Sequence, residues 1–324
     1  MANEIDKWGL IMRIEKGNSG ESVKEIQKLL GLTIDGEFGA KTEAAVKKFQ
    51  SSRGLLADGI VGNKTYAAMI AYTSDVSDGT FIDNDGILDD RGTYTTSDGL
   101  IIHKMYMDTD EYVTDAGTTD KDTLFIHHTA GRSNPFKTVK NWNLDTRGRI
   151  ATQYCIGGKS INGDTENDGV VVEAFPDEYY AWHLGKVGSH HMHKHSVGIE
   201  LNNWGYLYKD GDDYYNYVDI KVPKEQVVKL RKKFNGHYYY HMYSDAQLAA
   251  LKLLIYEIKR RHPKININLG LPQMLMNMDE FEAFGFNKAA YNGEINGILT
   301  HTNVRRDKTD CYPDSRLVAM LKSL

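Results

Sequence analysis

The stretches TLFIHH at residues 123–128 and SVGIEL at residues 196–201 decide the fold of the larger part of this chain. Both are short runs rich in apolar and β-branched residues, a composition typical of strands in a sheet. Farther along, Ser244 and Gln247 form a capping box, which predicts a long helix that ends before Pro263. Because strand patterns alternate with helical patterns, we expect an α/β domain with a mixed sheet.

Weaker patterns complete this domain. A further helix is expected after Asn134-Pro135. Further strands are expected at residues 100–102, 151–156 and 170–174. Residues 202–243 are rich in tyrosine and residues 264–297 form a long irregular connection, so sugar stacking, a lid beside a cleft and added core packing are all open interpretations of these two segments.

A repeated motif organises the N-terminal part of the chain. Asp35-Gly36-Glu37-Phe38-Gly39 precedes a helical pattern at Thr42, and Asp58-Gly59-Ile60-Val61-Gly62 precedes a similar pattern at Thr65. The Asp-Gly pair suits a tight turn, and the later glycine suits the entry to a helix. We therefore expect a small three-helix unit, although a plain helical bundle whose threonines only begin helices is an alternative.

The order of residues in this unit resembles the peptidoglycan-binding domain type 1 family. The residues that carry the resemblance are Gly17, Gly20, Val23, Ile26-Gln27, Leu30, Asp35-Gly36, Phe38-Gly39, Thr42, Ala45-Val46, Phe49-Gln50, Gly54-Leu55, Asp58-Gly59, Val61-Gly62 and Thr65. The resemblance implies that residues 1–72 form a domain that binds peptidoglycan.

Residues 73–98 separate the two parts of the chain. They are rich in Asp, Gly, Thr and Ser, with Arg91 as the single basic residue, and this composition predicts an acidic linker. The run Asp83-Asn84-Asp85-Gly86 has its glycine too early for an EF-hand loop, so we interpret it as a solvated turn. The α/β domain is therefore expected to span residues 99–324.

Composition narrows the partners of the chain. Its 324 residues carry a net charge of −5, with 41% hydrophobic and 26% charged residues, which argues against broad capture of nucleic acid or an anionic membrane. The sequence has no apolar run of about eighteen residues that would predict a membrane span, and its first twenty residues do not resemble a secretory signal. Its two cysteines, Cys155 and Cys311, cannot build a disulfide framework and suit a reducing compartment.

Histidines give the first indication of chemistry. The first strand ends in His127-His128, and strand alternation allows only one of the two to face a site. The run from His301 to Pro313 adds a histidine, a lysine, a carboxylate and a thiol. Three N, O or S ligands with an open position are the coordination of catalytic zinc. Because His127 and His301 lie far apart in sequence, spacing alone leaves buried histidines without a metal as an alternative.

Several motifs together resemble the N-acetylmuramoyl-L-alanine amidase type 2 family, which includes phage lysozyme-amidases and peptidoglycan recognition proteins. In chain order they are Phe125-Ile126-His127-His128-Thr129-Ala130-Gly131, Gln153-Tyr154, Ala181-Trp182-His183-Leu184-Gly185, Ser196-Val197-Gly198-Ile199-Glu200-Leu201, and His301 with Thr309-Asp310-Cys311. The match covers about residue 100 to the C-terminus and implies a zinc amidase domain.

The resemblance implies a set of metal ligands. His127 and His301 match the two zinc histidines of the family, and Cys311 matches the third ligand. Asp310 is the alternative, because one branch of the family ends this motif in a cysteine and another in an aspartate. Thiolate is the softer ligand for zinc, so we expect Cys311 on Zn²⁺ and Asp310 beside the ligands. The other thiol, Cys155, is expected in the core.

The resemblance also implies catalytic and binding residues. Glu200 matches a general base and Tyr154 matches a tyrosine that assists catalysis, and which of the two carries the proton stays open. Lys308 approximates a lysine of the family that stabilises the oxyanion, with a solvated loop cation as the alternative. Trp182 and His183 are expected to line a groove for the glycopeptide.

These assignments predict hydrolysis of the amide between N-acetylmuramic acid and L-alanine in bacterial peptidoglycan. With its wall-binding domain, the chain resembles a phage endolysin, which would stay in the host cytoplasm until it is released to the wall at lysis. A zinc peptidase that cuts within the stem peptide and a non-catalytic peptidoglycan recognition protein are the alternatives. A glycosidase would need a carboxylate pair instead of the metal, and no such pair is indicated.

Overall fold

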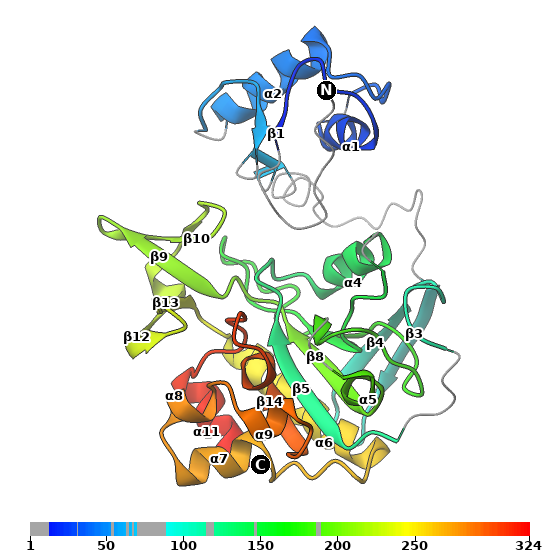
Figure 1. Ribbon diagram of the computed structural model, residues 1–324, viewed down its shortest axis with the longest axis vertical. Coiled ribbons are helices and arrows are strands. Elements are labelled where there is room, and N and C mark those ends of the chain that lie inside the picture. Colours follow the sequence, from blue (N-terminus) through cyan, green and yellow to red (C-terminus); the bar gives the residue numbers. More distant parts are fainter. Residues whose placement is uncertain are drawn as a thin grey trace. The chain divides into compact units, whose positions relative to one another are not determined.

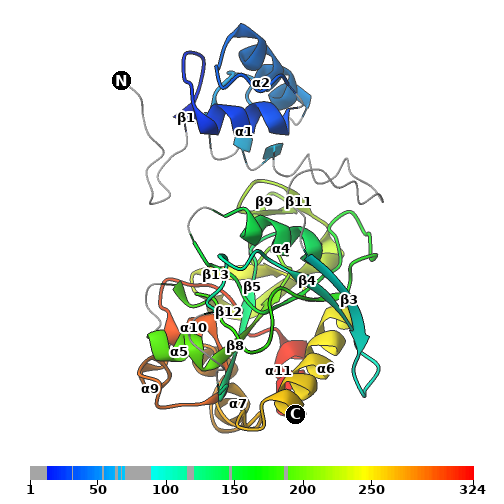
Figure 2. The same cartoon turned by 90° about the vertical axis from the view of Figure 1, so that its right-hand side faces the viewer.

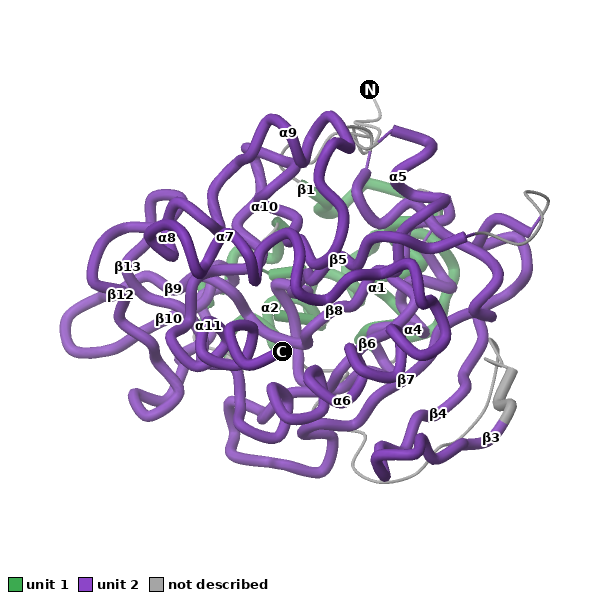
Figure 3. The backbone as a smooth tube through the Cα atoms, turned by 90° about the horizontal axis from the view of Figure 1, so that it is seen from below, with its two compact units in different colours: residues 1–82 green, residues 83–324 purple. Residues whose placement is uncertain are grey.

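The computed structural model describes residues 13–30, 32–52, 55–62, 65–66, 68–69, 89–114, 120–145, 148–185 and 189–324. The chain divides into two compact units, residues 1–82 and residues 83–324, which Figure 3 draws in separate colours. The predicted domain end at residue 72 and the predicted linker as far as residue 88 lie outside the described residues. Within the described ranges, every helix is too short or too polar to span a bilayer.

The first unit is a helical module with a small antiparallel ladder. Its elements are β1 (Arg13–Ile14), α1 (Glu21–Leu29), α2 (Ala40–Ser52) and β2 (Val61–Gly62), and β1 pairs with β2. Its core consists of Ile14, Val23, Ile26, Phe38, Val46, Phe49, Val61 and Met69. The third predicted helix, at Thr65, falls partly on residues outside the described ranges.

The sequence repeat appears in this unit as a repeated hydrogen-bonded turn. The Gln27 amide donates to the Asp35 carboxylate at 2.6 Å and to the Thr42 hydroxyl at 3.2 Å, and its carbonyl accepts from the Gly36 N–H at 2.9 Å. The corresponding bonds of Gln50 join Asp58 at 2.8 Å, Thr65 at 3.1 Å and the Gly59 N–H at 2.9 Å. Each buried glutamine therefore ties one Asp-Gly turn to the threonine that follows it.

The second unit is built on a seven-stranded mixed sheet with the strand order β14-β5-β8-β6-β7-β4-β3. The strands are β3 (Asp89–Thr95), β4 (Ile101–Tyr106), β5 (Thr123–His128), β6 (Tyr154–Ile156), β7 (Val171–Glu173), β8 (Ser196–Leu201) and β14 (Gly297–Thr300). The pairs β14–β5, β5–β8, β8–β6 and β4–β7 are parallel, and β6–β7 and β3–β4 are antiparallel. The predicted mixed α/β fold is confirmed.

The predicted acidic linker, residues 73–98, is wrong in its last part, because it contains strand β3. Residues 89–95 were assigned to the acidic linker, but they pair with β4 at the edge of the sheet. An edge strand packs against one neighbour only, so a polar sequence is compatible with the strand and hides it from an analysis based on hydrophobic pattern.

Helices cover both faces of this sheet (Figure 1). The long helix α6 (Asp245–Arg261) begins at its predicted cap, Ser244, which accepts a hydrogen bond from the Gln247 N–H. Together with α11 (Ser315–Lys322), which lies beside it in Figure 2, α6 packs over one face, and α4 (Pro135–Asn143) packs over the other. Alternation along β6 directs Tyr154 to the α6 face and Cys155 to the α4 face.

The two segments without an assigned role both have regular structure. Residues 206–241 form a five-stranded antiparallel sheet in the order β11-β10-β9-β13-β12. Its strands are β9 (Tyr206–Asp210), β10 (Asp213–Asn216), β11 (Lys221–Val222), β12 (Val227–Phe234) and β13 (His237–His241). The connection expected to be irregular contains α7 (Leu271–Asn277), α8 (Glu280–Ala283) and α9 (Lys288–Tyr291). Leu230, Phe234 and Tyr240 join the main core, so core packing is one role of the tyrosine-rich segment.

Candidate metal and catalytic site

Two neighbouring strands bring the histidines together. Strand β14 pairs in parallel with β5, with Thr300 opposite Ile126, and α10 (His301–Val304) begins directly after β14. His301 therefore comes beside His127 at the carboxyl ends of both strands. His128 points the other way, as alternation requires, and its Nδ1 forms a hydrogen bond of 2.9 Å with the Tyr243 hydroxyl.

Three buried ligand atoms converge at this point. His127 Nδ1 lies 3.1 Å from His301 Nδ1, and Asp310 Oδ2 lies 3.0 Å from His301 Nδ1 and 3.4 Å from His127 Nδ1. The ligand atoms of a tetrahedral zinc ion with bonds of 2.0–2.1 Å are about 3.3 Å apart. The separations and the N, N, O donor set therefore fit a zinc ion.

The charges of these groups also suit a metal. Burial lowers the pKa of His127 to about 4, so its imidazole is neutral at pH 7. Burial acts to raise the pKa of Asp310, but the neighbouring charge of His301 and the hydrogen bond of 3.0 Å with His301 oppose it, and that pKa lies well below its usual range. A neutral imidazole and an ionised carboxylate are the forms that bind divalent cations.

Cys311 lies apart from this cluster. Metal-ligating atoms from His127, His301 and Asp310 form a compact group among the described residues, and Cys311 is not part of it. The Cys311 side chain is fully buried, where burial raises the pKa of the thiol and the Tyr243 hydroxyl hydrogen-bonds to it. Asp310 and Cys311 are consecutive and their side chains diverge. The structure thus differs from the expectation that Cys311 is the third ligand and favours the alternative, Asp310.

Glu200 lies next to the group of His127, His301 and Asp310. In the β5–β8 pairing it lies opposite His127, so both side chains are on the same face of the sheet. Burial, followed by the nearby charge of Asp310, raises the pKa of Glu200 well above its ordinary value, and the Lys308 ammonium opposes this rise. A carboxyl group with a raised pKa beside a metal site is suited to proton transfer near neutral pH.

Lys308 is held by a contact that the sequence did not predict. Its backbone carbonyl accepts a hydrogen bond of 2.8 Å from the Asn235 side chain, which lies at the tip of the β12–β13 hairpin. Asn235 and Gly236 both have positive φ, of 43° and 89°, as in the two-residue Asn-Gly turns typical of hairpins. The Asn-Gly pair was a readable hairpin signal, but its contact with the metal-site loop depends on tertiary structure.

Comparison with known proteins assigns both parts of the chain. Residues 117–311 match the N-acetylmuramoyl-L-alanine amidase family, and residues 19–69 match the peptidoglycan binding domain family. The first match covers more than half of the chain. The chain belongs to the N-acetylmuramoyl-L-alanine amidase family. No curated protein matches it.

Several solved structures resemble parts of the chain. The N-terminal domain of SleB is 37% identical over 19% of this chain and 93% of its own, with a TM-score of 0.19. A fused Zn-dependent amidase/peptidase/peptidoglycan-binding protein from Clostridium acetobutylicum is 35% identical over 18% of this chain and 28% of its own, with a TM-score of 0.18. PlyL is 11% identical over 62% of this chain and 82% of its own, with a TM-score of 0.33.

Tyr154 does not reach the group formed by His127, His301 and Asp310. It pairs with Ile199 across β6 and β8, whereas Glu200 pairs with Cys155, so Tyr154 and Glu200 are on opposite faces of the sheet. The expectation that Tyr154 assists catalysis is therefore wrong on geometric grounds. Cys155 is fully buried on the α4 face, in agreement with its predicted place in the core.

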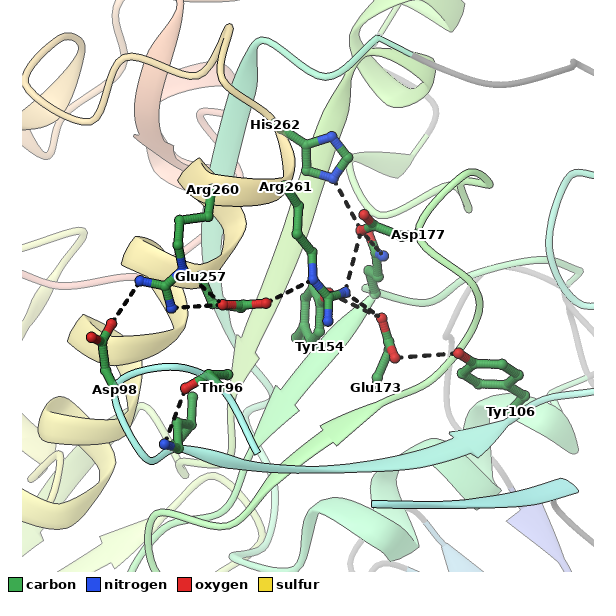
Figure 4. A network of polar contacts seen from close by, with 12 residues as sticks. Thr96, Asp98, Tyr106, Tyr154, Glu173, Asp177, Glu257, Arg260, Arg261 and His262 are labelled. Carbon is green, nitrogen blue, oxygen red and sulfur yellow. Dashed lines mark hydrogen bonds and ion pairs between the residues drawn. The ribbon is translucent and has the colours of Figure 1, made fainter. Parts of the chain in front are cut away.

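Tyr154 belongs instead to a polar network on the α6 face (Figure 4). Its hydroxyl donates to Glu173 at 3.1 Å and accepts from Arg261 at 3.0 Å, and Arg261 forms an ion pair of 3.1 Å with Glu173. His262, which follows Arg261, contacts Asp177 at 3.0 Å. This network fastens the C-terminal end of α6 to the sheet.

The two residues expected in the substrate groove differ in exposure. His183 is 8% exposed, and its ring nitrogens contact His127 at 3.0 Å and Ser196 at 2.8 Å. Both nitrogens are therefore engaged inside the protein, contrary to the expectation that His183 lines a groove. Trp182 is partly exposed and packs edge-on against Tyr180 and His190, and its place in a groove stays a prediction.

Proposed function

We propose that this chain is a zinc-dependent hydrolase that cleaves the amide between the lactyl group of N-acetylmuramic acid and L-alanine. The observation that carries the proposal is the convergence of His127, His301 and Asp310 beside Glu200. The donor set fits zinc, and family membership supports the amidase activity. A recognition protein without activity would not need a carboxyl group with a raised pKa beside the metal ligands.

His127, His301 and Asp310 would hold the zinc ion. When bound, zinc lowers the pKa of a coordinated water to about 7 and polarises the scissile carbonyl. Glu200 would take a proton from the attacking water, whose oxygen bonds to the carbonyl carbon, and deliver it to the nitrogen of L-alanine as the C–N bond breaks. The Lys308 ammonium would stabilise the oxyanion that forms on the carbonyl oxygen.

The first unit would hold the enzyme on the cell wall. Its match to the peptidoglycan binding domain family supports this role. Attachment to insoluble substrate raises the effective concentration of the catalytic unit at its target. We infer that the protein acts as a phage endolysin, because a wall-binding module joined to an amidase is the build of such lysis enzymes.

Deletion of residues 1–72 tests the wall-binding role. The shortened chain should hydrolyse small soluble muropeptides at the rate of the full chain but bind sacculi less tightly, since each unit is compact by itself. Co-sedimentation with purified sacculi measures binding. Equal binding of both chains would contradict the role.

Mass spectrometry of digested peptidoglycan identifies the bond that is cut. The proposal predicts glycan strands with free lactyl carboxylates and stem peptides with a new N-terminal L-alanine. These products should disappear after chelation and return with added zinc. New amino groups within the stem peptide would indicate a peptidase instead, and intact peptidoglycan would indicate a recognition protein.

A further inference from the structure

A buried series of hydrogen bonds extends from His127, on the side away from His301 and Asp310. His127 Nε2 lies 3.0 Å from His183 Nδ1, and His183 Nε2 lies 2.8 Å from Ser196 Oγ. Ser196 Oγ donates to the backbone carbonyl of Met192 at 2.6 Å. His127, His183 and Ser196 are all buried, so water does not compete for these bonds.

The last acceptor in this series of hydrogen bonds, the Met192 carbonyl, determines which atom donates in each bond. The Met192 carbonyl can only accept, so the single hydroxyl proton of Ser196 points to it. Ser196 Oγ must then accept from His183 Nε2–H, and the Nδ1 of a neutral His183 ring is left without a proton. This Nδ1 can only accept, so His127 carries its proton on Nε2. The Nδ1 of His127 is consequently bare and faces His301 and Asp310.

The fold reserves space for the intermediate ring. Gly198 lies on β8 beside His183, and a Cβ at this position would come within 3.1 Å of His183 Cγ and 3.0 Å of the Thr152 methyl carbon. Phe125 packs against His183 from β5, with ring centroids 5.6 Å apart. A side chain larger than glycine at residue 198 would displace the ring that contacts His127.

We propose that His183 and Ser196 are positioning residues that select the tautomer of His127 in which Nδ1 is free to bind the metal. This role rests on the proposed zinc site and assigns His183 a place behind a ligand instead of in the substrate groove. The tautomer of His127 is selected before the metal binds, because each hydrogen bond in this series joins two protein groups. Partners of this kind hold ring orientation and increase ligand basicity.

Three variants separate this role from simple packing. His183→Phe fills the space but leaves His127 Nε2–H without an acceptor, and it should weaken zinc binding about 10- to 100-fold. His183→Asn restores an acceptor at the position of Nδ1 and should keep zinc affinity within about threefold of the unaltered protein. Ser196→Ala removes the group that orients His183 and should have an effect between these two. Competition with a chromophoric chelator on the full chain measures each affinity.

A spectroscopic measurement reports the tautomer directly. In long-range ¹H–¹⁵N spectra of the metal-free protein, His127 should show a protonated Nε2 and a bare Nδ1. Ser196→Ala should give a mixture of tautomers at His127 while circular dichroism stays unchanged. A protonated Nδ1 in the unaltered protein, or equal zinc affinity in His183→Phe and His183→Asn, would overturn the proposal.

The two proposals fail in different ways. If the unaltered chain binds no zinc, the proposed metal site is wrong, whereas the tautomer of His127 in the metal-free protein can still be read. If the unaltered chain binds zinc tightly and His183→Phe binds it equally well, the metal site stands and the positioning role is wrong.

Discussion

The two faces of the central sheet each carry a glutamate in a different environment: Glu173 is buried and Glu200 is partly buried. On the α6 face, Glu173 receives hydrogen bonds from Tyr154 and Tyr106 and an ion pair from Arg261 (Figure 4). On the α4 face, Glu200 forms no side-chain hydrogen bond or ion pair with any described residue, although Lys308 acts on it through space. The two glutamates lie on the strands that flank β6, one residue apart in register, because Glu200 pairs with Cys155 and Glu173 pairs with Tyr154, but they differ in their fixed partners.

This difference is consistent with a structural role for Glu173 and with the catalytic role proposed for Glu200. Burial raises the pKa of both glutamates, but Arg261 and Tyr154 oppose the rise at Glu173 and fix its oxygens in place. A carboxylate that is saturated with protein donors cannot exchange a proton with substrate. Among the residues that the structure describes, none forms a side-chain hydrogen bond or ion pair with Glu200, which lies beside His127, His301 and Asp310. We therefore expect substitutions on the α4 face to change turnover and those on the α6 face to change stability.

Glu200→Gln should have the largest effect. It keeps the shape of the side chain and removes the base, so kcat should fall about 100-fold or more, as for loss of a positioned general base. Zinc content should be unchanged, because Glu200 is not among the converging ligand atoms. Release of muropeptides from sacculi and metal analysis of the same sample check both statements. Turnover within tenfold of the unaltered enzyme would remove Glu200 from the mechanism.

Arg261→Met should give the largest loss of stability. It leaves Glu173 buried without its cation, which should lower the free energy of unfolding by about 3 kcal/mol. Arg260→Met is the matched control on the same helix, because the exposed pairs of Arg260 with Asp98 and Glu257 should contribute at most about 1 kcal/mol. Chemical denaturation followed by circular dichroism measures both variants, and equal losses would contradict the structural role of the network.

Tyr154→Phe should have the smallest effect. The lost hydroxyl leaves Glu173 with one bond fewer, so the free energy of unfolding should fall by about 1 kcal/mol. Turnover of the folded enzyme should remain within about threefold of the unaltered enzyme, because the ring lies on the face away from the metal cluster. A drop in kcat as large as that of Glu200→Gln would show that the two faces are coupled.

The sequence predicted the elements of the sheet better than their relations. The helix cap at Ser244 and the strands that carry His127 and Glu200 follow from local pattern, and the structure contains them. Local pattern does not predict that Tyr154 and Glu200 lie on opposite faces of the sheet. Alternation assigns faces to residues within one strand, and the register between β6 and β8 is needed to compare residues on the two strands. Strand β3 was missed because polar residues at a sheet edge look like a linker.

The metal ligands illustrate the same limit within a loop. Asp310 and Cys311 are adjacent, and the resemblance to the family supports either as the third ligand. Their directions depend on loop conformation, which has no periodicity to read. His183 was predicted to belong to the site from its motif, but its place within the site was predicted wrongly. The structure places it behind His127, with its Nδ1 3.0 Å from His127 Nε2.

Zinc content of Asp310→Asn and Cys311→Ser tests the central claim most directly. Metal analysis of both purified full-length variants, beside the unaltered chain, compares two adjacent side chains of which one faces the histidines. We predict that Asp310→Asn loses most of its zinc and that Cys311→Ser retains about one equivalent, as expected for a site with three protein ligands. Loss of zinc from Cys311→Ser with full retention in Asp310→Asn would contradict this account of the metal site.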